Sequence, residues 1–169
     1  ELRSELGLSS TGHPLFEGQF APSTTLALFS RVLADRQPDW PAGTIVTGFP
    51  LYNGPDPLPP ALPAFLDAGD PPVVFTLGSS AVGAAGTFYE RSLAAVERLG
   101  VRAVFMTGGY DANLAGRSTS RVLWIDRAPH RLLFPRAAAV VHHGGVGTLG
   151  QALARSEEHT SELQSHSFI

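Results

Sequence analysis

Two turns rich in glycine and hydroxyl side chains could bind an anionic ligand. The first is Gly78-Ser79-Ser80, which follows an apolar run at 73–77, and the second is His143-Gly144-Gly145-Val146-Gly147-Thr148, which follows a run at 137–141. The glycines of the second turn, continued by Gly150, have the spacing G-x-G-x-x-G at a predicted strand-to-helix junction. Backbone N–H groups and a helix dipole bind diphosphates in that setting, although such glycines also serve close packing of a helix on a sheet.

The serines and histidines of these turns indicate binding rather than covalent or metal chemistry. The segment 78–82 lacks the G-x-S-x-G spacing of a nucleophile elbow, so Ser79 and Ser80 are interpreted as phosphate-binding hydroxyls or as caps of the next segment. His142 and His143 are consecutive on a predicted strand and point to opposite faces, which argues against a shared zinc ion. We expect one ring to donate to a phosphate oxygen and the other to pack under the sheet with a backbone partner.

Alternating strands and helices position both turns. Apolar runs predict strands at 73–77, 101–106, 122–125 and 137–141, with a helix at 87–99 and a second one starting near Gly145 or Val146. The four runs are nearly all apolar, as expected for strands buried on both faces. The sequence therefore predicts an α/β fold with a Rossmann-like parallel sheet, in which ligands bind beyond the carboxyl ends of the strands.

The N-terminal third is organised differently. Apolar runs at 25–30 and 44–49 predict two further strands, and six prolines follow between Pro50 and Pro63. So many prolines exclude a central strand and indicate an extended interdomain linker, which can still begin a short helix at 61–68. We assign 1–50 to the end of a first domain, 51–70 to the linker and 71–154 to a second domain.

Composition limits the classes of function. The 169 residues are 43% hydrophobic and 16% charged, as in globular proteins, and the net charge of -3 argues against a nucleic-acid partner. The chain has no cysteine and no apolar run of transmembrane length, so we expect a cytoplasmic protein without a transmembrane segment.

The composition changes abruptly after Ala154. Residues 155–169 begin with RSEEHTSELQS, which does not continue the apolar spacing of the preceding helix. This string resembles the translation of a short-read sequencing adapter, and we expect the tail to be an assembly artefact. A natural polar C-terminal segment is the alternative.

A wider pattern surrounds the second turn. It consists of Ala128-Pro129-His130, the segment 132–136 and the segment 139–148, and it extends back through 73–80 and 47–50. This pattern resembles the donor-binding signature of family 1 glycosyltransferases of GT-B fold, especially bacterial enzymes that glycosylate macrolides, sterols and flavonoids. The resemblance implies a partial GT-B fold, with a truncated C-terminal donor-binding domain and the end of the N-terminal acceptor-binding domain.

The resemblance also implies a reaction and its binding residues. The reaction is inverting, metal-independent transfer from a UDP- or TDP-sugar to a hydroxyl of a small-molecule or lipid acceptor, with no cofactor. The residues implied at the donor diphosphate are Ser79, Ser80, His143, Gly145, Gly147 and Thr148. Those implied at the base and ribose are Arg127, where plant relatives carry tryptophan, Ala128, and Gln151, where plant relatives carry glutamate.

The family's general base is expected upstream of Glu1, and its sugar-reading residues beyond Ala154, so no catalytic residue is assigned and the chain alone is expected to be inactive. Two other classes stay open. One is a non-catalytic nucleotide-binding auxiliary protein on the same scaffold. The other is a nucleotide-sugar epimerase, for which the sequence offers few carboxylates near the two turns.

Overall fold

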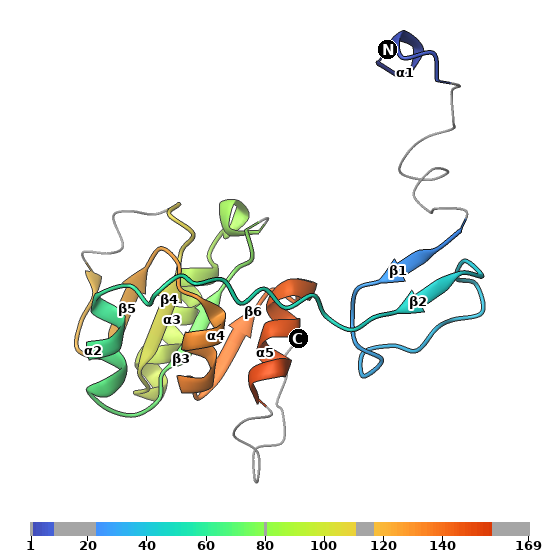
Figure 1. The fold of residues 1–169 in the computed structure, drawn as a ribbon. Helices are drawn as coiled ribbons and strands as arrows, with labels where there is room; N and C mark the ends of the chain where they lie inside the picture. The colour runs from blue at the N-terminus through green and yellow to red at the C-terminus, as the bar shows by residue number, and fades with distance from the viewer. Residues whose placement is uncertain (1, 9–22, 80, 111–116, 157–169) are drawn as a thin grey trace. The chain divides into compact units, whose positions relative to one another are not determined.

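The computed structural model describes residues 2–8, 23–79, 81–110 and 117–156, and the chain divides into two compact units, Glu1–Pro50 and Leu51–Ile169 (Figure 1). The predicted site residue Ser80 and the end of the predicted tail, 157–169, lie outside the described residues. No helix of the described ranges is long and apolar enough to span a bilayer.

The first unit contains a two-stranded parallel sheet. Its elements are α1 (Leu2–Glu5), β1 (Thr25–Ala27) and β2 (Thr44–Val46). Both strands lie within the runs that predicted them, and Leu26 pairs with Ile45. These two side chains are 55% and 54% exposed, so the paired strands present apolar surface. Phe29 and Trp40 pack edge to face nearby, with ring centroids 5.9 Å apart.

The second unit has a four-stranded parallel sheet in the order β5-β4-β3-β6, which confirms the predicted sheet (Figure 1). The strands are β3 (Val73–Thr76), β4 (Ala103–Met106), β5 (Val122–Ile125) and β6 (Ala139–His142). The helical elements are α2 (Ala61–Asp67), η1 (Val82–Ala84), α3 (Phe88–Leu99), α4 (His130–Leu133), η3 (Phe134–Arg136) and α5 (Val146–Ser156).

Alternate side chains of the strands feed two cores, one on each face of the sheet. Val74, Val104 and Leu123 pack with α2, α4 and η3, whereas the neighbouring residues Phe75, Phe105 and Trp124 pack against α3. This alternation follows from the two-residue period of a strand. The three aromatic rings face one another across paired strands, with centroids 4.7 Å apart for Phe75 and Phe105 and 4.2 Å apart for Phe105 and Trp124.

Helix α3 matches the predicted helix and ends as predicted at Gly100. Its side chains at Ser92 and Val96, four residues apart, are buried against the sheet. Gly100 has φ +64°, a left-handed conformation that glycine adopts without steric cost, and its N–H donates to the Glu97 carbonyl.

Three features differ from the sequence-based expectations or refine them. The expectation of burial on both faces is wrong for β6, where Ala139 and Val141 are exposed, because the core cluster on the α3 face of the sheet includes no residue of this strand. Helix α5 continues two residues past Ala154, to Ser156. Helix α2, inside the predicted linker, is part of the core through its buried Leu62.

Candidate functional site

The strand order reverses between β3 and β6. From β3 the chain proceeds to β4 and then β5 on one side, and it returns to pair β6 with β3 on the other. In open parallel sheets, ligands bind at such a reversal, beyond the carboxyl ends of the two strands. The two predicted turns follow β3 and β6 and therefore flank this position (Figure 1).

A hydrogen bond joins the two turns. The backbone N–H of Gly78 donates to Nδ1 of His143 over 3.0 Å, across 65 residues of sequence. Because Nδ1 is an acceptor, the proton of the neutral His143 imidazole lies on Nε2. The exposed His143 ring can therefore donate its Nε2–H to a ligand.

Two glycines make room for the His143 ring. A Cβ atom added at Gly78 would lie 2.4 Å from Cε1 of the ring, and one added at Gly145 would lie 2.4 Å from Nε2. Any side chain at either position would displace the imidazole. The two glycines therefore permit this position of the His143 ring, whereas the sequence suggested only phosphate approach or helix packing for Gly145.

A second histidine shapes the same turn from within. Nδ1 of His142, the last residue of β6, accepts the backbone N–H of Gly144 over 3.1 Å. Gly144 has φ +83°, which favours glycine, and it lies between the two histidines and the start of α5. His142 therefore has the backbone partner that was expected for one histidine of the pair, and His143 has one as well.

The first turn of α5 faces the same loop. The first N–H groups of a helix have no acceptor within the helix, and its dipole places partial positive charge there. Leu149 N–H donates to the Gly145 carbonyl over 2.9 Å, which is the first hydrogen bond of the helical type in α5. The N–H groups of residues 146–148 therefore form the open end of the helix. Gly147 is exposed, and a Cβ added there would meet no atom within 4 Å. Thr148 is 8% exposed.

The residues predicted at the base lie farther along the sheet edge. Arg127 and Ala128 follow β5, which is two strand spacings, about 10 Å, from β3. The Arg127 side chain is 82% exposed and its Nε lies 3.3 Å from a carboxylate oxygen of Asp126. Ala128 is buried in the core. Ser79 is exposed after β3.

Gln151 and Arg131 hold the proline-rich segment. Gln151 is 7% exposed, and its Nε2 donates to the Tyr52 carbonyl over 2.9 Å, while its Oε1 is buried with no partner among the described residues. Arg131 donates to the carbonyls of Gly54 and Asp56, over 2.8 Å and 3.1 Å. Residues 52–56 are thereby attached to the second unit, through contacts that span 75 to 99 residues of sequence.

His130 lies near His142 and adds to the electrostatics of the site. Its ring stacks on Phe134 with centroids 4.3 Å apart. Burial lowers the pKa of His130, and the nearby His142 lowers it further. Burial and the neighbouring His143 likewise lower the pKa of His142. Both rings are therefore held in the neutral form that can accept a hydrogen bond. The sequence pointed to no role for His130 or Arg131, whereas the adjacent histidines did indicate that one ring of the pair would have a backbone partner.

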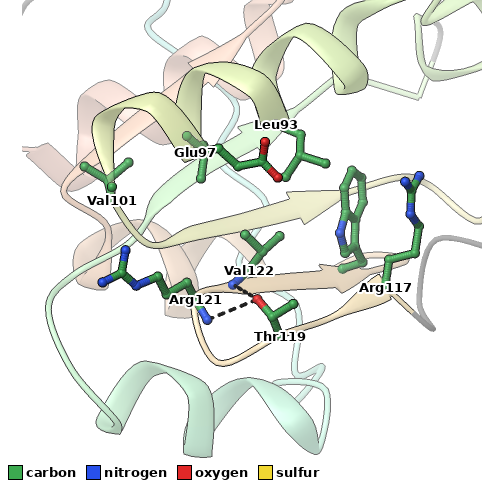
Figure 2. A pocket seen from close by; sticks show the side chains of 10 residues that line it. Leu93, Glu97, Val101, Arg117, Thr119, Arg121 and Val122 are labelled. Carbon is green, nitrogen blue, oxygen red and sulfur yellow. Dashed lines mark hydrogen bonds between the residues drawn. The ribbon is translucent and has the colours of Figure 1, made fainter.

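Among the described residues, no group of three or more His, Cys, Asp and Glu side chains is arranged to hold a metal ion. A cavity of about 370 Å³ lies elsewhere, between α3 and β5 (Figure 2). Apolar and charged side chains line it, among them Leu93, Val122, Trp124, Glu97, Arg117 and Arg121. None of the predicted donor residues lines this cavity.

Comparison with known proteins identifies glycosyltransferases among the relatives of this chain. The chain is 37% identical over 134 residues to the O-mycaminosyltylonolide 6-deoxyallosyltransferase of Streptomyces fradiae, a match that covers 78% of the chain and 31% of that protein. It is 38% identical over 117 residues to the vancomycin aglycone glucosyltransferase of Amycolatopsis orientalis, covering 69% of the chain and 28% of that protein. The chain thus spans less than a third of either relative. No protein-family model matches the chain.

The fold is similar to a solved structure of the same kind. The crystal structure of the glycosyltransferase SnogD from Streptomyces nogalater superposes with a TM-score of 0.50 at 34% sequence identity. The match covers 63% of this chain and 30% of that one.

Proposed function

We propose, from the premise that this chain is homologous to part of the family 1 glycosyltransferases of GT-B fold, that its second unit is the donor-binding part of such an enzyme. The whole protein would transfer a sugar from a UDP- or TDP-sugar to a hydroxyl of a small-molecule or lipid acceptor, with inversion. The base that deprotonates the acceptor would come from residues outside this chain.

The hydrogen bond between Gly78 and His143 carries the proposal. It joins the two turns at the reversal of strand order and leaves the Nε2–H of His143 as a donor beside the open end of α5. Three kinds of donor would then converge on a diphosphate: a ring N–H, the first N–H groups of α5 including that of Gly147, and the hydroxyl of Ser79. Each donates directly to phosphate oxygens, so the proposal requires no metal ion and no cofactor. For Ser80, which lies outside the described residues, the same role is proposed from the resemblance alone.

The nucleoside would extend from this point toward β5. The exposed guanidinium of Arg127 would stack on the base, and the backbone at Ala128 would read the base edge. Oε1 of Gln151 is the acceptor that we propose for a ribose hydroxyl. Because this atom is buried, the contact would require the Gln151 side chain or the chain around Tyr52 to move.

Calorimetric titration of the 169-residue chain with UDP, TDP and uridine, in the presence of EDTA, tests the proposal. UDP or TDP should bind, and uridine, which lacks phosphates, should bind more weakly. A His143→Ala variant should weaken UDP binding by about 10-fold or more, as expected for loss of a hydrogen bond to a charged group, and leave uridine binding unchanged. Equal losses for UDP and uridine, or no binding of either nucleotide, would contradict the proposed diphosphate site.

A further inference from the structure

The two adjacent histidines make the same kind of hydrogen bond but to different partners. His143 accepts the N–H of Gly78 from the opposite turn, whereas His142 accepts the N–H of Gly144, two residues ahead in its own turn. The second bond joins the last residue of β6 to the connection that leads to α5.

We infer that His142 is a positioning residue, which holds the Gly144 turn in its left-handed conformation and thereby orients both His143 and the start of α5. This inference rests on the proposed donor site, because that site consists of the groups that the turn orients. The resemblance implied no role for His142 at the donor site.

The geometry of the connection explains why such a tether matters. Only residues 143–145 separate the end of β6 from the start of α5, and Gly144 has φ +83°. Glycine has the greatest backbone freedom of any residue, and a Cβ at Gly144 would meet no atom within 4 Å, so there is open space on that side of the residue. The N–H bond to His142 is therefore a specific contact that restrains the orientation of Gly144.

The tether requires a neutral His142, because only the neutral imidazole has a lone pair on Nδ1. The titratable groups that face the ring are His143, next in the chain, and His130 at the start of α4. Burial, followed by the charge of His143, lowers the pKa of His142, which favours the neutral form in the folded chain. The half-buried setting of the ring therefore supports its role as an acceptor.

Two substitutions at one position separate acceptor chemistry from packing. In His142→Asn, the amide oxygen can accept an N–H two residues ahead, as in an Asx turn, whereas His142→Leu has a side chain of similar bulk and no acceptor. Loss of one hydrogen bond corresponds to about a 2- to 10-fold change in the population of the tethered turn. UDP binding to the full chain should weaken by that factor in the Leu variant and be restored in the Asn variant.

A readout that needs no nucleotide keeps this inference separate from the proposed function. Hydrogen exchange of the Gly144 amide, followed by NMR, should accelerate in His142→Leu and not in His142→Asn, whether or not the wild-type chain binds UDP. In the wild-type chain, the Gly144 amide resonance should shift with the protonation of the His142 ring, a measurement that needs no variant to fold. The inference would be overturned by an unchanged Gly144 exchange rate in the Leu variant, or by equal exchange rates in the two variants. A Gly144 chemical shift that does not change when the His142 ring is protonated would overturn it as well.

Discussion

Substitution of Gly78 by alanine should displace the ring of His143, which is proposed to contact the diphosphate, without changing His143 itself. The new Cβ would lie 2.4 Å from Cε1 of His143, inside van der Waals contact, so the ring must shift and its bond to the Gly78 N–H must break. Loss of that bond should lower the free energy of unfolding by about 0.5–1.5 kcal/mol. Loss of the Nε2–H as a donor to a charged phosphate should cost about 1.5–3 kcal/mol of binding, or roughly 10- to 100-fold in Kd.

The matched control is Gly69→Ala. A Cβ at Gly69 would lie 3.5 Å from the nearest atom, the Arg102 guanidinium, which is ordinary contact. Calorimetric titration with UDP should therefore distinguish the two alanine variants, while thermal unfolding shows that both are folded. Wild-type affinity in a folded Gly78→Ala chain would refute the reasoning, because it would mean that the ring position at this site does not matter for the donor.

Three further perturbations test other parts of the structure. Phe105→Ala removes the fully buried middle ring of the aromatic stack and should lower the free energy of unfolding in urea by about 3–5 kcal/mol; a loss below about 1 kcal/mol would show that this core is not packed as described. Arg131→Met should speed hydrogen exchange or proteolysis within residues 52–56, whereas the exposed Arg91→Met should not, and equal rates would refute the anchoring. Because the pKa values of His130 and His142 are lowered on folding, the unfolded chain binds more protons, and the free energy of unfolding should fall between about pH 7 and pH 5. A His130→Phe, His142→Asn double variant should show a flatter urea-unfolding profile over that range, and an unchanged slope would exclude these two rings as its cause.

The sequence predicted the strands and the parallel sheet well because each strand is a continuous apolar run. The run at 122–125 coincides with β5, and the helix that ends before Gly100 coincides with α3 within one residue. A strand buried on both faces appears in the sequence as a continuous apolar run, and the end of a helix appears as a glycine after the last apolar position. The short helix α4, with four residues, has too few turns for a periodic pattern and was not predicted.

Long-range contacts were the part that the sequence could not supply. Both glycine-rich turns were expected at the carboxyl ends of strands, yet which strands are neighbours is decided by tertiary packing. The bond from Gly78 to His143 and the room that Gly145 leaves for the ring depend on β6 pairing with β3. The attachment of the proline-rich segment through Gln151 is also a long-range contact, since Gln151 and Tyr52 are 99 residues apart in the sequence.

The most direct test of the donor-site proposal is an NMR titration of the 15N-labelled 169-residue chain with UDP, in which the perturbed amides locate the ligand. The proposal predicts the largest shifts at Gly78, Gly144 and Gly147, in the two turns that follow β3 and β6. Shifts confined to Val101 and Val122, beside the cavity between α3 and β5, would place the nucleotide elsewhere and contradict the proposal.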